Sequence, residues 1–396
     1  MGVSAHNSDD PWLNPEMLEW AREWRGLTLD DVAEKFKKTP DQIRAWELNE
    51  ASPTVKQARR LAELYHRAFS EFFLPSPPDI PKPKALPDFR LHKDVLDASH
   101  EWEVEQLQQW AETQRESALD LFQEIGERPP QIDADLFFSV KNDPEEAAMV
   151  ARGKVKFSKD DQFGLKKAQA YTLPNILRAK LEAIGVLTLR HSQLKDYGIR
   201  GMCIAEFPLP TIVITKESAT AQAFTVIHEF AHILLKASGV TGPRSKDYDN
   251  VPEERWCDRF AAAFLMPKTL VEDALGKKPG KPKSGISDED LEAAANLFRV
   301  SPHAMLVRLV HLGFVAAKYY WGVKKPQFDE QERSEKSFGR PKFYGTRYQS
   351  QLGDMYTGLV MEAWSSGRIT NHNAAEYMGI KNLKHLNDIR REYLGE

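Results

Sequence analysis

The chain has few of the features that mark a secreted or membrane protein. Its 396 residues include only two cysteines, Cys203 and Cys257, which excludes a disulfide framework and a four-cysteine zinc site. No apolar run is long enough to span a bilayer, and the first residues do not form a charged-then-apolar signal sequence. These absences indicate a cytosolic protein and argue against a secreted digestive protease.

An excess of charge of one sign is also missing. The formal net charge is −4, with 28% charged and 41% hydrophobic residues, which is ordinary for a soluble globular protein. The whole chain therefore has no general electrostatic attraction to nucleic acid or to membranes. Its length allows two or three domains.

The patterns along the chain predict a mostly helical α+β protein with one small sheet. Short helices are indicated near the N-terminus by Thr28, Thr39 and Ser52, each in an N-cap position. The runs "MCIAEF" (202–207) and "TIVIT" (211–215) predict a strand pair. We expect a helical bundle at 1–75, a proline-rich linker at 76–91, a connecting helix at 92–130, a domain with the sheet at 131–325 and a helical region at 326–396.

The segment "FTVIHEFAHILL" (224–235) carries the clearest chemical signal. On a helix, His228 and His232 lie on one face, so their imidazoles can hold one zinc ion. Glu229 lies about 100° around the helix, where it can take a proton from water and later deliver it to a leaving amine. The motif therefore predicts a hydrolytic zinc site.

A catalytic zinc needs a third protein ligand. The metzincin spacing would place glycine at 235 and histidine at 238, but the chain has Leu235 and Ser238. In the following apolar helix, "PEERWCDRFAAAFLMP" (252–267), Glu254 and Asp258 share a face. We expect Glu254 to be the third ligand and Asp258 to hold an imidazole N–H. Glu253 is the rival ligand, although it is out of phase with Asp258.

Other interpretations of these residues stay open. The two histidines can be core residues without a metal, or they can bind zinc without useful hydrolysis. Cys257 can be a ligand, but its apolar helical neighbours favour a buried structural thiol. The groups that stabilise an oxyanion are not identified, because nothing in the spacing chooses among Arg244, Tyr248 and His303.

The central part of the chain resembles the ImmA/IrrE family of zinc metallopeptidases. The resemblance rests on "FTVIHEFAHILL", "ERWCDRFAAAFLMP" and "FRVSPHAMLVRLVHLGFV", which occur in that order between about residues 140 and 320. It implies a gluzincin-like fold with His228, His232 and Glu254 as zinc ligands and Glu229 as general base. Members often act on one regulatory protein, such as a repressor.

The N-terminal part resembles a helix-turn-helix of the XRE (Cro/repressor-like) type. This order of domains, with "LPDFR" (86–90) between them, is similar to fused proteins encoded beside toxins. The resemblance implies an antitoxin or transcriptional regulator whose partner is a nearby toxin, often a PIN-like ribonuclease, or a repressor. It also implies operator DNA as a partner and, since Cro-like modules commonly pair, a homodimer.

Possible DNA contacts cluster at the start of the expected recognition helix, and these residues are Lys38, Thr39, Gln42 and Arg44. Residues 1–75 hold ten Lys/Arg and thirteen Asp/Glu, a net of −3, which is poorly suited to neutralising phosphates. A helical domain that packs on a protein is the alternative.

Two segments near the C-terminus allow more than one interpretation. The aromatic and basic stretch 318–348 can line a partner groove, touch RNA or form a solvated, partly disordered loop. The tail 365–394 contains "NAAEYMGI", a small-residue pattern of helix-turn-helix units, and a plain packing bundle is its alternative.

Overall fold

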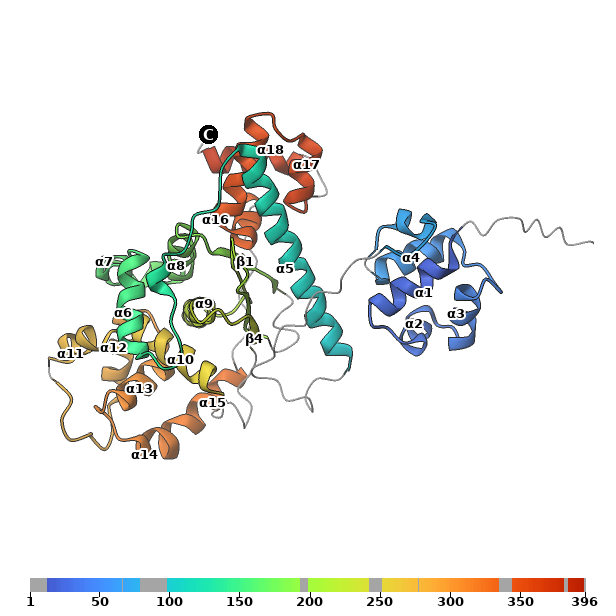
Figure 1. Cartoon of the computed structure of the whole chain (residues 1–396). Helices are drawn as coiled ribbons and strands as arrows, with labels where there is room; N and C mark the ends of the chain where they lie inside the picture. Colours follow the sequence, from blue (N-terminus) through green and yellow to red (C-terminus); the bar gives the residue numbers. More distant parts are fainter. Residues whose placement is uncertain are drawn as a thin grey trace, which may run out of the picture. The chain divides into compact units, whose positions relative to one another are not determined.

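The computed structural model divides the chain into two compact units, residues 1–84 and 85–396, and each unit is described by itself (Figure 1). The described residues are 13–65, 67–78, 98–192, 199–241, 251–276, 278–334, 344–380 and 384–394. Most of the expected linker, including "LPDFR", lies outside these ranges, as do Arg244 and Tyr248. No helix in the described parts of the chain is long and apolar enough to cross a membrane.

The N-terminal unit is a bundle of short helices. Its elements are α1 (Pro15–Trp24), α2 (Leu29–Phe36), α3 (Pro40–Glu47), α4 (Val55–Tyr65) and the 3-10 helix η1 (Phe69–Phe73). Thr28 and Thr39 both form capping boxes, and Asn14 caps α1, which explains where these helices begin. The helices bury their apolar faces around Met17, Ile43 and Leu61.

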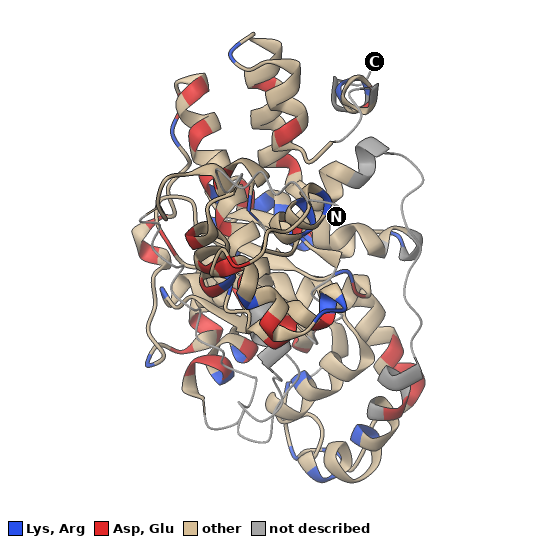
Figure 2. Ribbon diagram, turned by 90° about the vertical axis from the view of Figure 1, so that its right-hand side faces the viewer, with Lys and Arg blue, Asp and Glu red and all other residues tan. Residues whose placement is uncertain are grey.

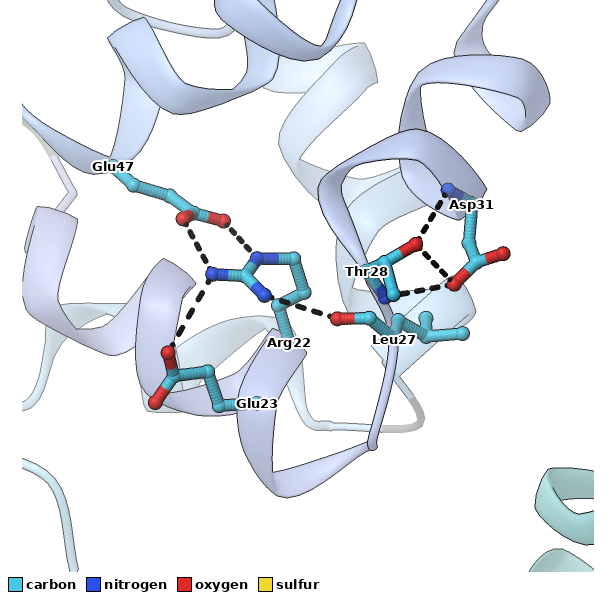
Figure 3. Close-up of polar contacts among 6 residues, drawn as sticks. All are labelled: Arg22, Glu23, Leu27, Thr28, Asp31 and Glu47. Atoms are coloured by element: carbon cyan, nitrogen blue, oxygen red, sulfur yellow. Dashed lines mark hydrogen bonds and ion pairs between the residues drawn. The ribbon is translucent and has the colours of Figure 1, made fainter. Parts of the chain in front are cut away.

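A buried ion pair joins the first and third helices of this unit. Arg22 donates two hydrogen bonds to the carboxylate of Glu47, from Nε at 2.7 Å and from Nη2 at 2.9 Å, and a third to the Leu27 carbonyl (Figure 3). The hydrogen bond to Glu47 raises the pKa of Arg22 against the opposing effect of burial. This pair fixes the orientation of α3 relative to α1.

The second unit is built on one four-stranded sheet, in the order β1 (Leu187–Arg190), β3 (Thr211–Ile214), β2 (Gly201–Ile204) and β4 (Gly239–Thr241). β1 runs parallel to β3, while β2 is antiparallel to both β3 and β4. The predicted pairing of "MCIAEF" (202–207) with "TIVIT" (211–215) is therefore confirmed. The predicted class, a mostly helical α+β protein with a small sheet, is also confirmed.

The remaining helices of this unit are α5 (Ala98–Ile125), α6 (Pro144–Lys154), α7 (Lys159–Phe163), α8 (Leu173–Glu182), α9 (Ala219–Leu234), α10 (Pro252–Leu265), α11 (Lys268–Leu275), α12 (Asp288–Phe298), α13 (Pro302–His311), α14 (Ala317–Tyr319), α15 (Lys325–Ser334), α16 (Tyr344–Ser365), α17 (Asn371–Tyr377) and α18 (Lys384–Leu394). Short 3-10 helices, η2 (Ala134–Leu136) and η3 (Lys167–Thr172), lie among them.

Helices cover both faces of the sheet. Successive side chains of a strand point to opposite faces, so alternate strand residues pack into the two layers. Cys203 and Ile212 point into the layer that contains α9 and α10. Met202 and Val213 point into the layer formed by α5 and the C-terminal helices. The helix predicted at 92–130 thus does more than connect, since α5 packs its apolar residues over the sheet.

A buried polar cluster ties α16 to the sheet. Arg178 donates to the Thr188 carbonyl at 2.7 Å and to the Ser350 carbonyl at 2.8 Å. Glu182 accepts from the Thr188 hydroxyl and, at 2.8 Å, from the Met355 amide. Burial raises the pKa of Glu182, against the lowering effect of Arg178.

The loop interpretation of the stretch 318–348 is wrong for the first half of that stretch. Residues 317–334 are helical and include the π-helix η6 (Tyr320–Lys324) between α14 and α15. Tyr320 and Phe328 are buried against the apolar core, which explains why this basic and aromatic sequence folds. Most of the second half of the stretch lies outside the described ranges.

Candidate metal centre

The two histidines of the motif lie on α9, which is buried on nearly all sides. Ser218 caps the helix by accepting from the Ala221 amide, and every residue from Thr225 to Leu234 is buried. A helix that is apolar around most of its circumference must lie inside a domain. α9 packs between the sheet and α10, so it is held from both sides.

Three side chains from two helices converge at one point. His228 and His232 come from α9 and Glu254 from α10, and their donor atoms all lie within 4.8 Å of one another. Nε2 of His232 lies 2.9 Å from Oε1 of Glu254 and 3.2 Å from Nε2 of His228. Nε2 of His228 lies 3.3 Å from Oε2 of Glu254.

These separations match the donor set of a small metal ion. Donors about 2.0–2.2 Å from a tetrahedral ion lie roughly 3.4 Å apart. The separations of 2.9–3.3 Å between the nitrogens and the carboxylate are close to that value. All three side chains are buried, with at most 1% of their surface exposed. Two imidazoles and a carboxylate are also a chemically suitable set for a transition metal.

The ionisation state of Glu254 also suits a metal ligand. Burial raises the pKa of Glu254, but its hydrogen bonds to His228 and His232 outweigh burial and hold the pKa well below the usual range. The carboxylate is therefore ionised, as a ligand must be.

The two cysteines do not have the ionisation state of a metal ligand. Burial raises the pKa of both Cys203 and Cys257 well above the ordinary value, so both are neutral thiols. Among the described residues, neither belongs to the group that could hold a metal. This agrees with a structural interpretation of Cys257.

Asp258 supports the outer side of one imidazole. Its Oδ1 lies 3.0 Å from Nδ1 of His228, one helical turn beyond Glu254. A carboxylate there fixes the ring orientation and leaves Nε2 directed at the shared point. Glu253 lies next to Glu254 but is not part of the converging group.

The neighbour of the first histidine, Glu229, is fully buried against strand β2. A Cβ built on Gly201 would lie 2.6 Å from Oε1 of Glu229 and 2.8 Å from Cγ2 of Thr225. The carboxylate thus occupies the space that any larger residue at position 201 would fill. Sequence reasoning missed Gly201, because nothing in the strand pattern marks it.

The C-terminal end of α10 is held by three side chains that sequence reasoning also missed. Arg152 donates to the Phe264 carbonyl at 2.6 Å, Gln162 to the Leu265 carbonyl at 2.9 Å, and Arg308 to the Met266 carbonyl at 2.9 Å. These bonds satisfy carbonyls that the helix leaves open at its end. They fix the helix that carries Glu254 and Asp258.

His303, one of the three residues considered for an oxyanion, belongs to a different cluster. Its Nε2 lies 2.9 Å from the hydroxyl of Tyr320, and its ring stacks on Phe328 at 4.8 Å between centroids. These contacts join α13 to η6 and α15.

The residues expected to touch DNA lie at the start of α3. Thr39 caps the helix, and the Thr39 amide donates to Oε1 of Gln42 at 3.1 Å, so the Gln42 side chain closes the capping box. Nζ of Lys38 lies 5.3 Å from the centre of the Trp46 ring. Gln42 and Arg44 are exposed. Acidic and basic residues are interspersed along most of the helices (Figure 2).

Comparison with known families finds a match for each of two regions of the chain. Residues 18–72 match the helix-turn-helix model, and residues 182–310 match the IrrE N-terminal-like domain. The chain combines a helix-turn-helix module with an IrrE N-terminal-like domain. The second match contains the converging group of α9 and α10, and it ends before α16. A comparison with curated proteins found no match.

Proposed function

We propose that the chain is a regulatory protein whose central domain binds zinc and hydrolyses a peptide bond of a partner protein. The observation that carries this proposal is the convergence of His228, His232 and Glu254 on one point, with Glu229 adjacent to it in the sequence. The match to the IrrE N-terminal-like domain supports it. The toxin or repressor expected beside such proteins is the proposed partner.

Each residue has one proposed task. A zinc ion bound by the two imidazoles and Glu254 would act as a Lewis acid that polarises the scissile carbonyl and activates water. Glu229 accepts a proton from water and passes it to the leaving amine. Asp258 holds the His228 ring in the tautomer that presents Nε2.

The N-terminal module is proposed to bind operator DNA. The helix-turn-helix match and the exposure of Gln42 and Arg44 on α3 support this role. Arginine recognises guanine, and the amide of glutamine recognises adenine, in the major groove. Residues 18–72 hold ten basic and ten acidic residues, so we expect weak non-specific affinity and strong dependence on these few contacts.

One observation favours a second candidate function. Glu229 is fully buried, so its carboxylate is not open to solvent in this structure. A protein that neutralises a PIN-like toxin by binding alone would not need the base exposed. In that case the zinc site would stabilise the domain, and the partner would remain intact.

The substitution Glu229→Gln separates the two candidates. The purified neighbouring gene product is incubated with each form, and its cleavage is followed by mass spectrometry alongside its toxicity. Peptidase action predicts that Glu229→Gln retains its metal and loses both cleavage and neutralisation. Neutralisation that survives in the variant, with an intact partner, would instead support the binding antitoxin.

A further inference from the structure

The last three helices repeat the local geometry of the N-terminal helix-turn-helix. α1 ends at Trp24 and is followed by Gly26 with φ 73°, while α16 ends at Ser365 and is followed by Gly367 with φ 72°. In both turns the glycine amide donates to a carbonyl three residues earlier, and the next amide donates to a carbonyl five residues earlier. Each first helix therefore ends in the same type of C-cap.

The second helices also correspond. Thr28 and Thr370 both cap the helix in a full capping box, closed by Asp31 and Asn373 three residues later. The matching buried positions, four and five residues after the cap, are Val32 and Ala33 in the first unit and Ala374 and Ala375 in the second. A left-handed residue follows nine after each cap, Lys37 with φ 54° and Gly379 with φ 65°.

The third helix of each unit contacts its first helix, α18 on α16 and α3 on α1. The two units differ in the main contact of this helix, because α3 packs mainly on α2, whereas α18 packs mainly on α16. Each is anchored by two buried residues three apart, Ile43 and Trp46 in α3, and Leu386 and Ile389 in α18. Counted from the cap, the anchors of α18 come one residue later in the sequence.

A similar turn joins α12 to α13, but there the second helix has no exposed face. Arg299, with φ 58°, follows α12, and Ser301 caps α13. Every residue of α13 except His311 at its end is buried or half-buried, so this second helix has no exposed reading face. Its geometry serves the core of the domain.

α18 differs from α13 because its outer side is exposed. Asn387, Arg390 and Arg391 are exposed there, together with Asp388, whose Oδ2 lies 3.7 Å from Nδ1 of His385. The guanidinium of Arg390 lies over the ring of Trp364, 5.4 Å from its centre, which holds it against α16. Residues 344–394, the span of α16 to α18, contain six Lys/Arg and five Asp/Glu, a net of +1 against zero for residues 18–72.

We propose that α16, α17 and α18 form a second helix-turn-helix that binds duplex DNA, with α18 in the major groove. Asn387 and Arg391 lie one turn apart on the exposed side and present the amide and guanidinium groups that recognise adenine and guanine. The family match to a helix-turn-helix covers only residues 18–72, so this unit adds a DNA contact beyond the proposed function.

The test uses the full-length protein and labelled random-sequence duplexes of about 30 base pairs, roughly three helical turns. Fluorescence anisotropy gives the dissociation constant at salt concentrations from roughly 50 to 200 mM. The test variant is Asn387→Ala/Arg391→Ala, and the control is Arg128→Ala, which removes an exposed arginine beyond the end of α5. The test variant and the control variant are also made in an Arg44→Ala background, which weakens DNA binding by the N-terminal module. Circular dichroism checks that each variant is folded.

In both backgrounds the double variant should weaken binding about 10-fold and reduce the slope against log salt by about one, while Arg128→Ala leaves both unchanged. Equal binding by the double variant and its parent would overturn the proposal. The proposal would also be overturned if the double variant kept its DNA affinity but no longer bound a protein partner. That result would indicate that α18 contacts a protein. Sensitivity to Arg44→Ala alone would contradict the second module and leave the N-terminal one standing.

Discussion

The carboxylate of Glu229 lies where a side chain at Gly201 would be. A Cβ on Gly201 would meet Oε1 of Glu229 at 2.6 Å and its Cδ at 3.0 Å. Contacts below about 3 Å between such atoms are not tolerated without movement. The missing side chain on β2 therefore sets the position of the proposed general base on α9.

Gly201→Ala should displace the Glu229 carboxylate and leave the three metal donors in place. A misplacement of about 1 Å in a catalytic group lowers the rate roughly 100-fold, so we expect that loss in kcat with unchanged metal content. Gly153→Ala is the control, because a Cβ there meets nothing within 4 Å. Full activity of Gly201→Ala would show that the base position does not depend on this contact.

Asp258→Asn should weaken metal binding without abolishing it. The carboxylate that lies 3.0 Å from Nδ1 of His228 would be lost, and such supporting partners typically contribute 10–100-fold in metal affinity. Competition with a chromophoric chelator measures the dissociation constant. Glu253→Gln makes the same chemical change on the same helix, outside the converging group, and should bind metal like the parent. Equal affinities for the two variants would contradict the role of Asp258.

Gly353→Ala should loosen the docking of α16 on the sheet. Gly353 has φ 85°, and a Cβ there would lie 2.3 Å from Oε1 of Glu182 and 2.7 Å from the Thr188 carbonyl. Strain and overpacking together should lower the free energy of unfolding by about 2–5 kcal/mol. Gly367→Ala has a positive φ of 72° and open space around its Cβ, so it shows the effect of a positive φ without a steric contact. Thermal melts that move equally for both variants would exclude the steric contribution.

Glu47→Ala should destabilise the N-terminal unit, because it leaves the Arg22 guanidinium buried without its main partner. Breaking a buried pair in this way costs about 3–5 kcal/mol. Glu23 also lies near Arg22, at 3.8 Å, but 64% of its side chain is exposed. Glu23→Ala should therefore change stability by less than about 1 kcal/mol. Chemical denaturation, monitored by hydrogen exchange of the amides in α1 and α3, measures the stability of both variants. Similar losses of stability in Glu47→Ala and Glu23→Ala would refute the role of the buried pair.

The sequence was most informative where a repeating pattern coincided with chemistry. The spacing of His228 and His232 and the phase of Glu254 with Asp258 are properties of single helices, so helical geometry alone relates each pair. Strand β3 follows from an equally local signal, the run "TIVIT" (211–215). It lies where it was predicted.

What the sequence left open depends on contacts between distant segments. The closeness of Gly201 to Glu229 requires knowing which strand covers α9, and no local pattern reveals it. Arg152 and Gln162 look like ordinary surface residues until α6 and α7 are placed against the end of α10. The basic stretch after residue 317 folds as helix because Tyr320 and Phe328 find an apolar surface to pack on.

The most direct test of the central claim is the metal content of the purified full-length protein, measured by inductively coupled plasma mass spectrometry for wild type, Glu254→Ala and Glu253→Ala. Wild type and Glu253→Ala should each contain one zinc per chain and Glu254→Ala none, with all three folded by circular dichroism. Folded wild-type protein without zinc, or zinc retained by Glu254→Ala, would contradict the central claim and return His228 and His232 to the role of core residues.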